Sequence, residues 1–171
     1  MQFNSATFAV FMLFVLVLYW FFLNHPKRLN TRNSFILCVS YLFYGWWDWR
    51  FLSLIVISSG VDFAVGLKLG EEEKDRRQRK IWLGLSLLTN LGMLGAFKYF
   101  NFFLESADAA LQLFGLNAFD LRLQWILPVG ISFYTFQTLS YTIDIYRGQL
   151  KPVSNPISFF AFVAFFPQLV A

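Results

Sequence analysis

Polar side chains recur at helical spacing within the apolar stretch 127–148. They are Tyr134, Gln137, Thr138, Tyr141 and Asp144. At about 100° per residue they fall on one side of a helix, whereas Phe136, Leu139 and Ile143 fall on the other. Phenol, amide and carboxylate groups hydrogen-bond polar substrates, and lipid offers them no partner. The spacing therefore predicts a helix with one polar face. The functional interpretation of that face is a polar passage through the protein, walled by Tyr134, Gln137, Tyr141 and Asp144.

Two carboxylates lie within apolar segments, where a charge costs about 2.5–3.5 kcal/mol on insertion scales. Asp144 stands about one turn before Arg147, so an ion pair at the helix end is an equal alternative to a role in the passage. Asp62 follows two serines and a glycine, small residues that let helices pack closely. This pattern favours a structural role for Asp62 as a polar residue inside the membrane.

No residue of the chain is predicted to be catalytic. His25 is the only histidine and has no neighbouring carboxylate to orient it, which favours an interfacial position over general-base chemistry. Cys38 is the only cysteine, and the sequence has neither metal-ligand spacing nor a glycine-rich phosphate loop. We therefore expect no bound metal ion and no bound cofactor.

The composition indicates a membrane protein. Hydrophobic residues make up 57% and charged residues 14% of the 171 positions, whereas about a quarter of the residues of a soluble domain are charged. We expect one all-α polytopic transmembrane domain with about five complete spans, an incomplete sixth and an interfacial helix over 105–116. The apolar segments cover residues 6–23, 34–47, 51–69, 81–103, 126–145 and 157–171.

Basic residues follow alternate apolar segments. They are Lys27, Arg28 and Arg32, then Lys74, Arg76, Arg77, Arg79 and Lys80, then Arg147 and Lys151. Because basic short loops favour the cytoplasm, the sequence predicts that these loops are cytoplasmic and that the N-terminus lies outside. This orientation explains the net charge of +4 without nucleic-acid binding. The charged run 71–80 is either a solvated loop or a patch for lipid headgroups or a partner.

Several motifs resemble those of the membrane-bound O-acyltransferase family. Within it they resemble the bacterial branch that includes the alginate O-acetylation membrane protein and the D-alanine transfer protein of teichoic acids. The motifs are LPVGISFYTFQ (127–137), YTIDIYRG (141–148), YLFYGWW (41–47), DF (62–63), KYFNFF (98–103) and FFPQLVA (165–171).

The resemblance implies a multi-pass enzyme of the bacterial cytoplasmic membrane. Such an enzyme passes an acyl group, acetyl in the first place, from acetyl-CoA or an acyl carrier to hydroxyls of an extracytoplasmic polysaccharide such as alginate. It also implies partner proteins of the same acetylation pathway. Residues 1–171 are then expected to be the N-terminal part of a single acyltransferase domain, truncated before the half that holds the catalytic histidine of the family.

Two other classes of protein stay open at this point. In a transporter or flippase fragment, the polar face would line a substrate path without acyl chemistry. A small membrane scaffold would have no catalytic role at all. The absence of an inverted repeat disfavours the transporter, and the unfinished last apolar segment disfavours the scaffold.

Overall fold

The computed structural model describes residues 5–23, 29–47, 49–71, 75–113 and 130–169, and every regular element in these ranges is helical. The elements are α1 (Ala6–Leu18), a short π-helical segment η1 (Tyr19–Leu23), α2 (Leu29–Trp47), α3 (Trp49–Leu69), α4 (Arg76–Leu113), α5 (Ile131–Arg147), α6 (Pro156–Val163) and α7 (Phe166–Leu169). The predicted all-α class is confirmed.

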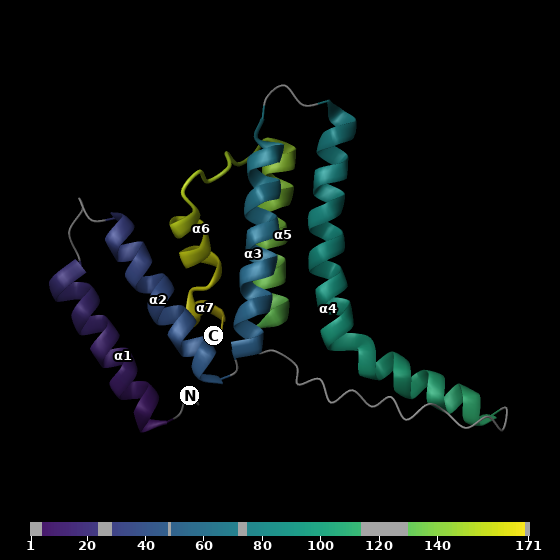
Figure 1. Ribbon diagram of the computed structural model, residues 1–171, viewed down its shortest axis with the longest axis horizontal. Coiled ribbons are helices and arrows are strands. Elements are labelled where there is room, and N and C mark those ends of the chain that lie inside the picture. Colours follow the sequence, from purple (N-terminus) through teal and green to yellow (C-terminus); the bar gives the residue numbers. More distant parts are fainter. Residues whose placement is uncertain (1–4, 24–28, 48, 72–74, 114–129, 170–171) are drawn as a thin grey trace.

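The helices run alternately up and down in Figure 1. Helices α3, α4 and α5 pack against one another as a three-helix unit, and α2 packs against α3 and α6. The C-terminal part of α4 bends away from this unit and projects to the side (Figure 1). The three-helix unit is therefore the part of the fold in which side chains from distant segments meet.

Two predicted boundaries differ from the structure. The apolar segment 81–103 and the proposed interfacial helix are one continuous helix, α4, as far as Leu113. The last apolar segment is divided, because α6 ends at Val163 and α7 begins at Phe166. Pro167 explains this break, since proline lacks an N–H group and its ring clashes with the carbonyl four residues earlier in a continuous helix.

Aromatic rings form the core beside the three-helix unit. The rings of Phe43 on α2 and Phe166 on α7 lie 5.1 Å apart, and Tyr141 on α5 lies 4.8 Å from Phe159 on α6. These contacts bury large apolar surfaces and join α2, α5, α6 and α7. They hold the two short C-terminal helices against the rest of the fold.

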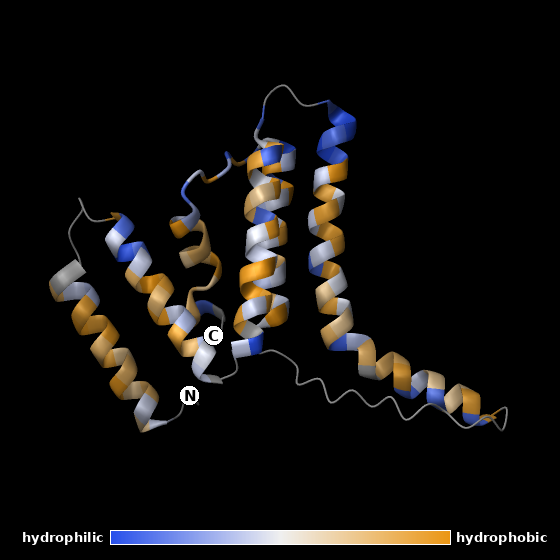
Figure 2. Ribbon diagram, viewed as in Figure 1, coloured by the Kyte–Doolittle hydropathy of each residue, from blue (hydrophilic) through white to orange (hydrophobic). Residues whose placement is uncertain are grey.

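Within the described residues, two helical stretches are long and apolar enough to cross a membrane, Leu52–Leu69 and Arg76–Phe100. The stretches Ala6–Phe21 and Pro156–Gln168 are apolar but shorter. The predicted number of spans is therefore not confirmed. Figure 2 shows apolar residues along most helices and hydrophilic residues at the start of α4.

Candidate functional site

Asp62 on α3 is fully buried where α3, α4 and α5 meet. Ser86 Oγ on α4 donates to its Oδ1 at 2.5 Å. The amide Nδ2 of Asn90, one turn further along α4, donates to Oδ1 at 2.9 Å and to Oδ2 at 2.8 Å. Both carboxylate oxygens therefore have partners, and all these partners are neutral groups.

Three further hydroxyl groups, from Ser58, Thr138 and Thr142, contact these partners. Ser58 Oγ donates to Asn90 Oδ1 at 2.7 Å, and Thr138 Oγ1 on α5 lies 3.4 Å from the same oxygen. Ser86 Oγ and Thr142 Oγ1 lie 3.1 Å apart. Because an ionised carboxylate only accepts hydrogen bonds, the amide nitrogen of Asn90 must face Asp62, and its Oδ1 then accepts from the hydroxyls. We call Ser58, Asp62, Ser86, Asn90, Thr138 and Thr142 the Asp62 cluster.

The Asp62 cluster joins three helices by one repeated pattern. Each helix contributes two polar residues four positions apart, which lie on the same helical face. Sequence analysis singled out Asp62 and the small residues beside it but missed Ser86, Asn90 and Thr142. The spacing of four between polar residues in apolar helices was the signal that would have found them.

The four passage residues reach different parts of the fold. Tyr134 is 1% exposed, and its hydroxyl has no hydrogen-bond partner within the described residues. Gln137 Nε2 donates to the carbonyl of Phe162 at the end of α6, at 3.2 Å. The Tyr141 hydroxyl accepts a bond from the backbone N–H of Val153 at 3.1 Å. No hydrogen bond among the described residues joins one of these side chains to another.

Asp144 is half-buried near the end of α5. Its backbone carbonyl accepts from the N–H of Gln149 at 2.9 Å, and Gly148 ends the helix with a φ of 75°. The alternative ion pair with Arg147 is not seen, since the single ion pair of the described ranges joins Lys68 to Glu71 at 2.9 Å. Thr138, on the same predicted polar face, belongs to the Asp62 cluster.

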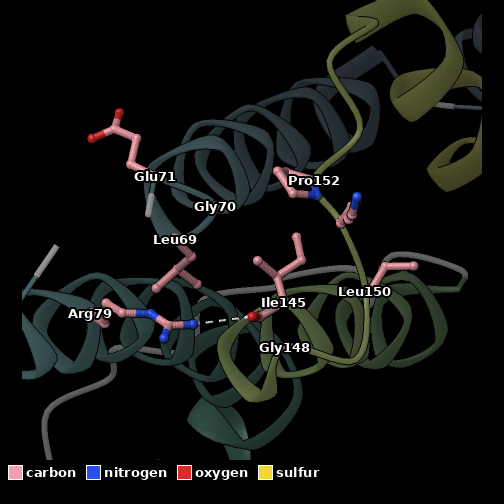
Figure 3. Close-up of a pocket in the computed structure, with 9 residues that line it drawn as sticks. Leu69, Gly70, Glu71, Arg79, Ile145, Gly148, Leu150 and Pro152 are labelled. Carbon is pink, nitrogen blue, oxygen red and sulfur yellow. Dashed lines mark hydrogen bonds between the residues drawn. The ribbon is translucent and has the colours of Figure 1, made fainter. Parts of the chain in front are cut away.

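Arg79 on the first turns of α4 binds the carbonyl end of α5. Its Nη2 donates to the carbonyls of Tyr146 at 2.9 Å and Ile145 at 3.3 Å, and its guanidinium lies over the Tyr146 ring. Figure 3 shows the side chain directed at the Ile145 carbonyl. A cation at a helix C-terminus is stabilising because the last carbonyls carry partial negative charge.

Replacing Arg79 by Gln is expected to lower the free energy of unfolding by about 1 kcal/mol, because α5 loses a charged donor at its C-terminus. Detergent-solubilised protein titrated with a denaturing detergent and followed by circular dichroism measures this change. Arg77→Gln is the matched control, because Arg77 is exposed and makes none of these bonds. Equal losses in both variants would contradict this role of Arg79.

The described residues contain no group of three His, Cys, Asp or Glu side chains that would hold a metal ion. His25 lies outside the described ranges. The arrangement that is present, a buried carboxylate held by amide and hydroxyl groups, fixes the three helices relative to one another.

Apolar helices joined by a buried polar cluster, with basic residues near one end, are typical of helical membrane proteins. The chain is 40% identical over 171 residues to "Probable alginate O-acetylase AlgI" of Pseudomonas syringae pv. tomato. The matched region is 100% of this chain and 32% of that protein. The chain is 39% identical to the protein of the same name from Azotobacter vinelandii, over 100% of this chain and 33% of that protein.

A third relative is the peptidoglycan O-acetyltransferase of Helicobacter pylori, at 31% identity over 99% of this chain and 36% of that protein. These similarities confirm the resemblance to O-acyltransferases of the membrane-bound type. The chain spans about a third of the length of these curated relatives. No family model matches the chain. No solved structure matches it either.

Proposed function

We propose that this chain is part of an enzyme that transfers an acetyl group to hydroxyls of an extracytoplasmic polysaccharide. The observation that carries the proposal is the similarity of the whole chain to proteins named for O-acetylation. Alginate is the favoured acceptor, because the relatives named for alginate are 36–43% identical and the one named for peptidoglycan is 31% identical. Peptidoglycan or another exopolysaccharide is the alternative acceptor.

We infer that the acyl donor is acetyl-CoA or an acyl carrier on the cytoplasmic side, and that partner proteins of the pathway act outside. The acid–base histidine of the reaction is assigned to a part of the enzyme other than this chain. Residues 1–171 then form the N-terminal part of one acyltransferase domain. Their contribution to the reaction is to hold helices in place and to wall a path between the two sides.

We place the protein in the bacterial cytoplasmic membrane as a multi-pass protein, with its N-terminus outside. In α4 the stretch from Ile81 to Phe100 is about 30 Å long, which matches the hydrocarbon thickness. Arg76, Arg77 and Lys80 precede this stretch, and Lys98 lies near its other end. The predicted apolar segments that precede and follow α4 in the sequence are assigned as further membrane spans.

The part of α4 beyond Phe100 is assigned as an interfacial helix. It leaves the three-helix unit at the end opposite to the basic residues of α4 (Figure 1). Glu105, Asp108 and Gln112 recur on one helical face, whereas Phe102, Phe103 and Leu113 are 61%, 66% and 87% exposed. Exposed apolar side chains beside a polar stripe suit a helix that lies at the membrane surface.

Cysteine labelling tests this orientation. In a Cys38→Ser background, Glu105→Cys, on the polar stripe of the interfacial helix, is expected to react with a membrane-impermeant maleimide in intact spheroplasts, whereas Lys151→Cys is expected to react only after permeabilisation. Both positions are exposed, so accessibility within the fold does not limit either reaction. The reverse pattern would contradict the assigned orientation.

Tyr134, Gln137, Tyr141 and Asp144 are proposed to wall the acyl passage. Support comes from the buried Tyr134 hydroxyl and the Gln137 Oε1, which have no hydrogen-bond partner within the described residues and are available to a substrate. Tyr141 and Asp144 lie further along the same helix, toward its basic end.

The passage is tested in a chimera in which this chain replaces the matching segment of alginate O-acetylase AlgI. The double substitution Gln137→Leu and Tyr141→Leu is expected to lower alginate acetylation by about tenfold or more, at unchanged protein level, because polar contacts to the moving group are lost. Phe136→Leu is the matched control, since Phe136 is 59% exposed on the opposite face of α5. Normal acetylation by the double variant would refute the passage assignment.

A further inference from the structure

A cavity of about 220 Å³ lies where the ends of α3 and α5 meet the start of α4. Figure 3 shows Arg79 on one side of this cavity and Pro152 on the other. Leu69, Ile145 and Leu150 contribute apolar wall. Lys151 and Glu71 add one charge of each sign.

Positive charge dominates this end of the three-helix unit. In the sequence, residues 68–80 and 144–151 together hold eight basic residues and five carboxylates, the undescribed Glu72, Glu73 and Lys74 included. The Glu71 carboxylate is already engaged by Lys68 at 2.9 Å. Apart from that pair, the described ranges contain no ion pair that would neutralise the remaining cations.

The Arg79 guanidinium is fixed by its bonds to the α5 carbonyls, and its buried Nε has no partner within the described residues. These bonds offset the partial negative charge at the end of α5. The positive potential at the cavity therefore comes mainly from Lys151 and the exposed basic residues around it. An apolar wall beside a cationic rim suits a ligand that is anionic at one end and apolar at the other.

We propose that this cavity binds the phosphate headgroup of an anionic phospholipid, with Lys151 at the phosphate and Leu150 and Pro152 against the adjoining apolar part of the lipid. The inference rests on the membrane placement proposed above, which puts this end of the helices at the level of the cytoplasmic headgroups. A soluble phosphate compound would share the cationic contact but would make no use of the apolar wall.

Lipid binding to the purified chain in detergent tests the proposal by native mass spectrometry. Phosphatidylglycerol and phosphatidylcholine with the same acyl chains are compared at equal concentrations. We expect phosphatidylglycerol to bind about fivefold more tightly, and Lys151→Gln to remove this preference, because one basic residue near a headgroup contributes about that factor. Arg77→Gln is the matched control, since it removes a charge from the same end but outside the cavity lining.

Equal binding of the two lipids, or equal effects of the two substitutions, would overturn the proposal. Displacement of phosphatidylglycerol by an equal concentration of glycerol 3-phosphate would also overturn it, in favour of a soluble phosphate ligand. Insertion into vesicles is measured in parallel. Failure to insert would contradict the membrane placement, whereas insertion without a preference for phosphatidylglycerol would contradict the lipid site alone.

Discussion

Replacing Asp62 by Ala is expected to lower the free energy of unfolding by about 2 kcal/mol, because interhelical hydrogen bonds in membrane proteins contribute roughly 0.6–1.7 kcal/mol each. The substitution removes the acceptor of Ser86 Oγ and of Asn90 Nδ2 and leaves these donors buried. Of the contacts of this cluster between α3 and α4, the Ser58–Asn90 bond alone is then left, and the link to α5 through Thr142 weakens.

Denaturing-detergent titration followed by circular dichroism measures the loss. Ser53→Ala is a suitable control on the same helix, because the exposed Ser53 hydroxyl donates only to the Arg50 carbonyl of its own helix. The double variant Asp62→Ala and Asn90→Ala is expected to lose less than the sum of the two single changes, since both remove the same contact. Strict additivity would contradict a connected cluster.

Gly66→Ala is expected to destabilise the fold by about 1–3 kcal/mol, the range for overpacking a filled core. A Cβ atom at Gly66 would lie 2.7 Å from Tyr141 Cε1 and 2.8 Å from its hydroxyl oxygen. The Tyr141 ring cannot withdraw easily, because its hydroxyl is bound by Val153 and its ring packs on Phe159. Helices α3 and α5 must therefore separate slightly.

Gly60→Ala on the same helix is the control for this substitution. Nothing lies within 4 Å of a Cβ atom at Gly60, so the variant is expected to be neutral or to gain helix stability of up to about 1 kcal/mol. The same titration compares the two alanine variants. Similar stabilities would show that Tyr141 does not press against Gly66 as described.

Much of the fold was predictable from apolar periodicity. The segment 51–69 corresponds closely to α3, because it is mainly apolar and long enough to be recognised as a helix without tertiary information. The sequence predicted two helices where the structure has one, α4. Near Phe103 the residues change from apolar to mixed, which alters the surroundings of a helix but does not end it. The break after Val163 could have been predicted from Pro167, because a proline ring does not fit inside a continuous helix.

The candidate site was less predictable, because its partners are far apart in the sequence. Ser86 and Asn90 lie 24 and 28 positions from Asp62, and only the packing of α4 on α3 brings them together. The polar face of α5 was predicted from spacing, but its side chains serve separate purposes. Thr138 joins the Asp62 cluster, whereas Tyr141 holds the segment after α5 through Val153.

Acetyl transfer by a chimera tests the central proposal most directly. This chain replaces the matching 171-residue segment of the Pseudomonas syringae alginate O-acetylase AlgI in a strain without its own copy, and the acetyl content of secreted alginate is measured. A chimera carrying an unrelated membrane segment of the same length is the negative control. The proposal predicts acetylated alginate from this chimera alone. Unacetylated alginate, with the chimera present in the membrane at the level of the native enzyme, would contradict it.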